Sequence, residues 1–201
     1  MKIPPLYFVD TRMDSFIKAL NSYAPLSAAC IAEFVRIVRR KTIPKYEFLL
    51  REGSIPKTVA FIKKGLFSYY YTTEEGNIVI KKFFAENSFV ASTSAMLQKE
   101  PGIFNIYALE DAEVLEYDFS SFQQLIAKFP ELAIFYSKYM EKHWVVAKEV
   151  LEITAKYQNA KERYLSFTVM YPGLSERLKQ HHIASYLGIT PTQLSRIRKE
   201  L

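Results

Sequence analysis

The stretch Leu178–Leu201, LKQHHIASYLGITPTQLSRIRKEL, decides the C-terminal part of the fold. Two short helical patterns flank Gly188, a residue without a Cβ that permits the tight turn between two crossing helices. Thr190 is a good N-cap, Pro191 suits the first helical position, and Gln193 completes a capping box. The stretch therefore predicts a helix-turn-helix whose second helix begins after Thr190.

The second helix has an apolar and a polar face. Leu194, Ile197 and Leu201 recur at helical spacing and are expected to pack on the first helix. The opposite face and the start of the helix form the predicted DNA-contacting surface. Its residues are Thr190, Pro191, Thr192, Gln193, Ser195, Arg196, Arg198 and Lys199. An ordinary helical hairpin inside a larger core is the alternative interpretation.

Positive charge gathers in the same part of the chain. The net charge is +6, and from Gln158 onward seven Lys and Arg residues oppose three Glu residues. This distribution is typical of a segment that approaches phosphates, although a solvated basic face would look similar. Arg196 lies one turn into the helix, where it can contact a base, whereas Arg198 and Lys199 are better placed for phosphates.

Composition limits the remaining classes of protein. A chain of 201 residues with 14 Tyr and 15 Phe favours two domains, one of them rich in strands. A single cysteine, Cys30, excludes an intrachain disulfide, a zinc ribbon and a cysteine-ligated iron–sulfur cluster. No apolar run is long enough for a membrane span and no signal peptide is recognisable, so we predict a cytoplasmic protein without membrane contact.

No arrangement of residues suggests catalysis. The three histidines, His143, His181 and His182, fall on predicted helices outside the strand-rich region, where a metal enzyme would need them. No phosphate-binding loop, dinucleotide fingerprint or nucleophile elbow occurs. We therefore expect no enzyme, no catalytic residues, no metal site and no cofactor.

The region before the long helix predicts an antiparallel barrel or roll. Helices are expected over Asp14–Leu20, from Ser27 to Arg40 and over Asp118–Lys128. Between the last two, short β-type runs are separated by turn signals, which is typical of such a sheet. The runs are EFLL, VAFI, LFSYYYT, IVIKKFF, FNIYAL and VLEYD.

One long helix is predicted from Glu131 to about Tyr157, because no Pro or Gly interrupts it. Apolar residues alternate at intervals of four and three, which indicates a seam along which two copies pair. The seam consists of Leu132, Tyr136, Tyr139, His143, Val146, Val150, Ile153 and Tyr157. A second stripe is expected to lie on the roll of the same chain; it consists of Phe135, Trp144, Ala147 and Leu151. A helix buried within one larger core is the alternative, and His143 is either a pH sensor or a hydrogen-bonded interface residue.

This order of elements resembles the catabolite-activator and fumarate-nitrate-regulator (Crp/Fnr) family of bacterial transcription regulators. The segments that carry the resemblance are PKYEFLLREG, FIKKGLFSYYYTTEEGNIVIKKFF, ALEDAEVLEY and HHIASYLGITPTQLSRIRKEL. The last segment is similar to a subgroup with a T-P-x-x-L-S-R-I-R recognition helix. The resemblance implies an α+β fold: an N-terminal β-roll like a cyclic-nucleotide-binding jelly roll with flanking helices, a long dimerisation helix and a C-terminal helix-turn-helix.

The resemblance also implies a function and a division of the chain. We expect a homodimeric, sequence-specific DNA-binding transcription regulator with a β-roll domain over residues 1–130, a dimerisation helix over 131–157 and a DNA-binding domain over 158–201. The implied partners are double-stranded DNA, a second copy, RNA polymerase and an unknown small-molecule effector. The alternative is a small-molecule-binding module whose helical tail mediates protein contacts.

Two departures from the family pattern concern the roll. Cyclic-nucleotide-binding members hold the ribose with a Gly-Glu pair and the phosphate with an Arg-Ser or Arg-Thr pair. Here the corresponding places contain Phe89-Val90-Ala91-Ser92 and Pro101-Gly102-Ile103. Because a buried phosphate needs a cationic partner, we predict no cyclic nucleotide binding in the family manner. If another effector enters, the positions near the family's pocket are Phe89, Ser92, Thr93, Phe104 and Asn105.

A third departure concerns the wing of the DNA-binding domain. Family members usually place a β-hairpin before the helix-turn-helix and strands after it. The segment from Tyr171 to Leu178 leaves little room for a hairpin, and no strand follows before Leu201. We therefore expect fewer contacts to the DNA backbone from a wing.

Overall fold

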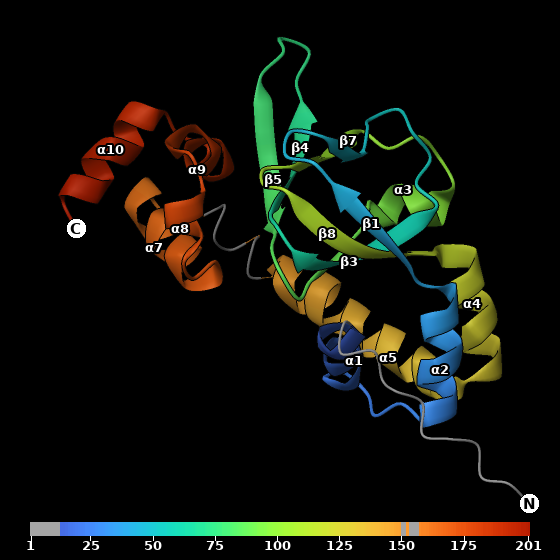
Figure 1. Ribbon diagram of the computed structural model, residues 1–201. Coiled ribbons are helices and arrows are strands. Elements are labelled where there is room, and N and C mark those ends of the chain that lie inside the picture. The colour runs from blue at the N-terminus through green and yellow to red at the C-terminus, as the bar shows by residue number, and fades with distance from the viewer. Residues whose placement is uncertain (1–12, 150–151, 153–156) are drawn as a thin grey trace, which may run out of the picture.

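The computed structural model describes residues 13–149, 152 and 157–201. A β-roll occupies the centre, a group of helices covers one end, and the C-terminal helices lie beside another side of the roll (Figure 1). This arrangement confirms the predicted α+β class with a jelly-roll-like antiparallel sheet and helical ends. In the described part of the chain, no helix is long and apolar enough to span a membrane.

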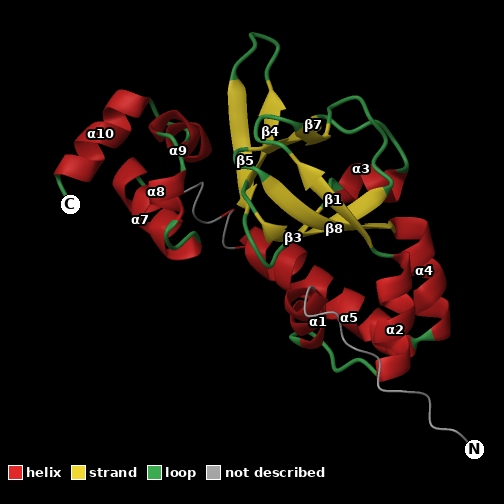
Figure 2. Ribbon diagram, in the orientation of Figure 1, coloured by secondary structure: helices red, strands yellow, loops and turns green. Residues whose placement is uncertain are grey.

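The roll consists of two four-stranded antiparallel sheets (Figure 2). Their strand orders are β1-β8-β3-β6 and β2-β7-β4-β5. Apolar side chains of both sheets, such as Ile62, Phe67 and Ile106, are buried in one shared core. The strands are β1 (Arg39–Ile43), β2 (Phe48–Leu50), β3 (Thr58–Lys64), β4 (Phe67–Thr72), β5 (Ile78–Phe84), β6 (Phe89–Val90), β7 (Phe104–Ala108) and β8 (Ala112–Asp118). All six predicted β-type runs lie on strands.

Glycine is required in the turn between β3 and β4. Gly65 has a φ of 107°, and a Cβ there would lie 2.6 Å from the Cβ of Ala112. No other residue fits this combination of positive φ and close approach. The backbone N–H of Gly65 donates a hydrogen bond to Oε1 of Glu86 (2.9 Å), which holds that carboxylate at the edge of the roll.

The predicted helix from Ser27 to Arg40 is wrong at its C-terminal end. Helix α2 (Ala28–Ile37) begins as predicted, because Ser27 Oγ accepts the N–H of Cys30. It ends at Ile37, and β1 begins two residues later, paired with β8 over its full length. The basic residues of β1 had no local signal for a strand, since their pairing partner lies more than seventy residues away. Strand β6 and helix α3 (Thr93–Gln98) were also not predicted.

Four helices cover one end of the roll (Figure 1). They are α1 (Asp14–Asn21), α2, α4 (Phe119–Lys128) and α5 (Pro130–Met140). Their apolar faces meet β3, β6 and β8 in a core rich in aromatic rings. The ring of Phe16, for example, makes edge contacts with Phe34 and Phe61 at centroid distances of 5.3 and 5.4 Å. This packing fixes the direction in which the long helix leaves the roll.

The long helix changes geometry part-way along. After α5 the chain forms a π-helical segment, η2 (Glu141–Val146), and continues as helix to Glu149. Each π turn holds an extra residue, so it shifts the faces of the helix relative to a continuous α-helical pattern. Residues spaced at intervals of four and three therefore do not all lie on one face of the helix across this segment.

Three of the predicted seam residues face the roll of their own chain instead of a partner. Leu132 is fully buried in the helical core, and Tyr139 packs on Phe89 with a ring distance of 5.5 Å. Nε2 of His143 lies 2.7 Å from the phenol oxygen of Tyr23. The placement of these three residues in a dimer seam is thus corrected: up to His143, this stripe packs on the helix's own chain.

The remaining predicted residues divide by exposure. Tyr136 is partly buried against the helical core, whereas Val146 and Tyr157 are exposed at 58% and 80%. Val150 and Ile153 lie outside the described residues. In the second stripe, Phe135 is buried on the roll as predicted, but Trp144 is 40% exposed, because it follows the start of the π segment and faces away. Leu151 also lies outside the described residues.

The position of His143 does not suit a pH sensor near neutrality. Burial, with further contributions from Lys82 and Lys142, lowers the pKa of its imidazole to about 4. The ring is therefore neutral at pH 7 and forms its hydrogen bond with Tyr23 in that state. Of the two interpretations, the hydrogen-bonded residue agrees with the structure, with the partner in the same chain.

Candidate DNA-binding surface and sensor cavity

The last four helices form a compact unit, called the head here (residues 159–201). They are α7 (Ala160–Met170), α8 (Leu174–Arg177), α9 (Gln180–Leu187) and α10 (Pro191–Lys199). Helix α7 begins with a capping box between Asn159 and Glu162. The guanidinium of Arg163 donates to the carbonyl of Leu187, which joins α7 to the end of α9.

The turn and start of the second helix agree with the sequence prediction. Gly188 caps α9 with a φ of 65°, in the left-handed region. Thr190 Oγ1 accepts the N–H of Gln193 (3.1 Å), and Gln193 Oε1 accepts the N–H of Thr190 (2.9 Å). Both side chains therefore stabilise the start of α10. Gln193 keeps its amide N–H groups for another partner.

Helix α10 buries its apolar face and exposes its basic face. Leu194 is fully buried and Ile197 is 8% exposed, as predicted. Leu201 is 60% exposed, contrary to prediction, because the helix ends at Lys199. The exposed residues of the predicted surface are Thr190, Pro191, Thr192, Gln193, Arg196 and Lys199, and the half-buried ones are Ser195 and Arg198.

The cationic side chains of α10 differ in whether they contact another residue of the chain. Nε of Arg198 donates to the phenol oxygen of Tyr164 on α7 (3.2 Å), and its guanidinium lies over that ring. Arg196 and Lys199 are exposed and, in the described part of the chain, form no ion pair. Arg196 is therefore available to a partner outside the chain.

The head is packed against the roll of its own chain. Apolar residues of α7, α8 and α9 share a core with Leu66, Ile80 and Phe83 of the roll. Strand β5 is an edge strand, and Ser185 of α9 satisfies part of its free backbone. Ser185 Oγ accepts the N–H of Ile80 (3.1 Å) and donates to the carbonyl of Ile78 (2.6 Å). A side chain of α9 thus takes the place of a neighbouring strand.

One arginine fixes this contact. Arg177 donates to both Glu86 and Glu110 of the roll, with N–O distances between 2.6 and 2.9 Å. Partial burial would raise the pKa of Glu86, but hydrogen bonds from Arg177 and from the Gly65 N–H outweigh it and lower the pKa to about 2. Glu86 therefore stays ionised at neutral pH, and Arg177 joins the head to the roll through two ion pairs with defined geometry. No local pattern had indicated Arg177 or Ser185, because their partners are distant in sequence.

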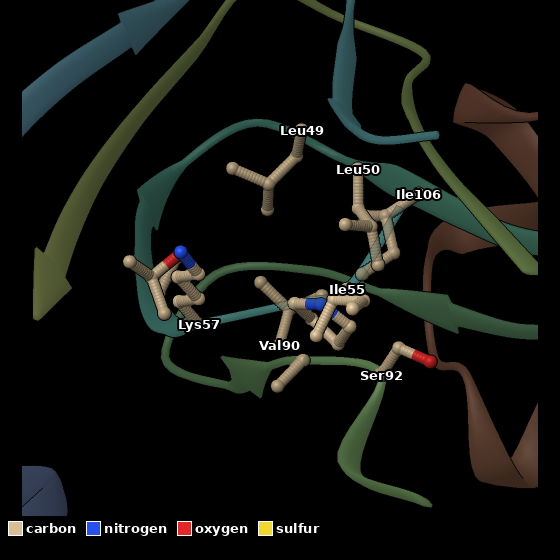
Figure 3. Close-up of a pocket in the computed structure, with 11 residues that line it drawn as sticks. Leu49, Leu50, Ile55, Lys57, Val90, Ser92 and Ile106 are labelled. Atoms are coloured by element: carbon tan, nitrogen blue, oxygen red, sulfur yellow. The ribbon is translucent and has the colours of Figure 1, made fainter. Parts of the chain in front are cut away.

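The roll contains a cavity of about 180 Å³ between β2, β3 and β6 (Figure 3). Leu49, Leu50, Val90 and Ile106 give it an aliphatic wall, and Lys57 is the one charged residue in its lining. The volume is below the roughly 300 Å³ at which typical small-molecule pockets begin. The cavity suits a small, mainly apolar molecule.

Only one of the five predicted effector residues lines this cavity. It is Ser92, whose hydroxyl is directed at Tyr69 Oη (3.1 Å) and points away from the centre (Figure 3). Phe89 is packed in the helical core, and the amide of Asn105 bonds Glu52. Phe104 packs on Tyr69, and Thr93 begins α3. The aliphatic lining was missed because strand-core residues and cavity residues have the same sequence pattern.

Comparisons with known proteins agree with this architecture. Residues 40–129 match the model of the cyclic nucleotide-binding domain. The chain is 27% identical to the fumarate and nitrate reduction regulatory protein of Yersinia pestis, over 80% of this chain and 68% of that protein. The relative thus matches a larger share of the chain than the domain model does. Together the two findings support a transcription regulator of the Crp/Fnr type.

Solved structures support the same fold. FixK2 from Bradyrhizobium japonicum matches with a TM-score of 0.70 at 16% identity, covering 82% of this chain and 84% of that one. The c-di-GMP-responsive global regulator CLP of Xanthomonas campestris matches with a TM-score of 0.67 at 15% identity, covering 87% and 91%. Both matches show that this chain shares the fold of these two regulators.

The phosphate-binding features of the Crp/Fnr family are absent from the expected places in this chain. Strand β6 is followed by Ala91 and Ser92, and β7 is preceded by Gly102 and Ile103. A Cβ on Gly102 would lie 3.2 Å from Ala95 and 3.4 Å from Ser92 Oγ, so helix α3 fills the space beside it. Among the described residues, no cluster of His, Cys, Asp and Glu could hold a metal ion.

Proposed function

We propose that the protein acts as a cytoplasmic homodimer in which each α10 contacts one half of a two-fold symmetric DNA site. The free basic face of α10, with Arg196 at its centre, is the observation that carries this proposal. In helix-turn-helix proteins the second helix enters the major groove, and dimers bind half-sites about one helical turn apart. Residues 1–130, 131–157 and 158–201 then act as the sensor, the dimerisation helix and the DNA-binding unit.

The dimer surface that we propose lies on the outer face of the long helix. An apolar groove of about 420 Å³ runs there between α4, α5 and η2, lined by Tyr136, Met140, Trp144 and Val145 among others. Val145 and Val146 are each 58% exposed. If a second copy covered this face, its apolar surface would be removed from water, which favours association.

Selection from random DNA tests the function. The full-length wild-type chain should enrich a motif with two-fold symmetry from a random duplex library at about 0.15 M salt. Enrichment of no motif, combined with sequence-independent gel shifts, would favour the alternative in which the helical tail binds proteins.

We expect neither cyclic AMP nor cyclic GMP to bind tightly. The cavity is small and aliphatic, and Lys57, the charged residue in its lining, is exposed to solvent. A buried phosphate would lack the guanidinium that compensates its desolvation. Calorimetry should detect no binding at nucleotide concentrations up to about 100 μM, which corresponds to roughly −5.5 kcal/mol. A dissociation constant of 1 μM or lower would contradict this account of the roll.

A further inference from the structure

The turn between β1 and β2 presents a tyrosine in an unusual conformation. Tyr46 has a φ of 72°, in the left-handed region that side chains seldom adopt. Its N–H donates to the carbonyl of Ala108 (2.8 Å), and the Lys45 N–H donates to Oδ1 of Asp111 (2.8 Å). The backbone is therefore held firmly, while the side chain of Tyr46 is 51% exposed.

Two ammonium groups from different parts of the chain meet at this ring. Nζ of Lys45 lies 5.0 Å from the ring centroid, and Nζ of Lys179, at the start of α9, lies 5.9 Å from it. The hydrogen bond from Lys45 lowers the pKa of the Tyr46 phenol, and Lys179 acts in the same direction. In the described part of the chain neither lysine forms an ion pair. The two ammonium groups repel each other, so an anion bound between them would be stabilised.

The cluster lies next to the start of the recognition helix. Lys179 is the N-cap of α9, and its side chain forms no cap hydrogen bond. Nε2 of the adjacent Gln180 donates to the carbonyl of Pro191 at the start of α10 (2.5 Å). In this motif α10 enters the major groove while α9 crosses the backbone, so the cluster lies on the side of the flanking phosphates.

Arg177 keeps the roll part of the cluster beside the head. Its ion pairs with Glu86 and Glu110 anchor the residues immediately before Lys179 to the roll. Helix α8, which ends at Arg177, also occupies the stretch where the family pattern has a hairpin wing. The turn of the roll therefore lies close to the head without a wing between them.

We propose that Lys45, Tyr46 and Lys179 form a contact surface for the DNA backbone that flanks the bases contacted by α10. The surface offers two ammonium groups and one phenol hydroxyl to phosphate oxygens. It rests on the proposed DNA-binding function and adds that the roll itself touches DNA. The turn between β1 and β2 then supplies contacts that a wing makes elsewhere.

The test is the salt dependence of DNA affinity, measured on the motif selected by the wild-type protein. Each lost phosphate contact reduces the slope of log K against log salt by about 0.9. Because the dimer carries each substitution twice, Lys45→Gln with Lys179→Gln should reduce it by up to about 3.6, and each single variant by up to about 1.8. Lys128→Gln, a change of an exposed charge at the C-terminal end of α4, is the matched control and should leave the slope unchanged.

Two further measurements make the test decisive. Selection from random DNA should return the wild-type motif for the double variant, because phosphate contacts carry no base information. Hydroxyl-radical footprinting should show loss of protection outside the motif. An unchanged slope and footprint in a folded double variant would overturn the proposal. Failure of the wild type to select any motif would instead overturn the proposed function, and the two failures are thus distinguishable.

Discussion

A protein that carries Val145→Glu and Val146→Glu should sediment as a monomer at micromolar concentration and lose tight binding to its DNA site. Both valines are more than half exposed on the outer face of the π segment, so the substitutions leave the chain's own core intact. Two carboxylates per copy in an apolar interface would have to be desolvated without partners. A monomer retains one half-site, and loss of the second typically lowers affinity by about 10²–10⁴-fold.

Leu97→Glu with Ile103→Glu is the matched control. These two residues are 50% and 60% exposed on the roll, away from the long helix, and the same two charges are added. The control should remain dimeric and bind DNA as the wild type does. If the Val145 and Val146 variant sediments as a dimer, the interface lies on another surface and the proposed role of the groove is wrong.

Arg196→Ala should flatten the preference among DNA sites. The guanidinium is exposed one turn into α10 and can donate two hydrogen bonds to O6 and N7 of guanine. Such a pair is worth about 1–3 kcal/mol of discrimination, or roughly 5- to 150-fold in each half-site. Selection from random DNA with the variant should therefore lose one conserved guanine per half-site, while the other positions persist.

Lys199→Ala is the comparison for Arg196. It removes one exposed cation from the last turn of the same helix, where contact with a phosphate is expected. Affinity should fall for all sequences alike, and the salt slope of the dimer should drop by about 1.8, because each copy loses one phosphate contact. If both variants select the wild-type motif, Arg196 contacts a phosphate and the assignment of its base-contacting role fails.

Features with local causes were predictable from the sequence. The capping box of Thr190 and Gln193, the turn at Gly188 and the buried Leu194 depend on residues within one or two helical turns. The six predicted β-type runs could also be predicted, because alternating apolar residues and turn residues are local sequence signals. The arrangement of these elements in the fold was predicted correctly from the resemblance to the family.

Features that depend on distant partners were not predictable. β1 is a strand because β8 pairs with it, and its basic residues would suit a helix equally well. Leu132, Tyr139 and His143 pack on distant parts of their own chain, and the π segment shifts the faces of the helix that follow it. The docking of the head through Ser185 depends on an edge strand about one hundred residues earlier, which no local pattern reveals.

The most direct test of the central claim, that two copies of α10 contact two half-sites on one face of DNA, is a spacing experiment. The selected site would be compared with one in which five base pairs are inserted between its half-sites, with affinities measured by gel shift at fixed salt. Half a turn of DNA places the second half-site on the opposite face of the duplex. The account predicts that affinity falls to about the level of a single half-site. Equal affinity for the two DNAs would contradict it.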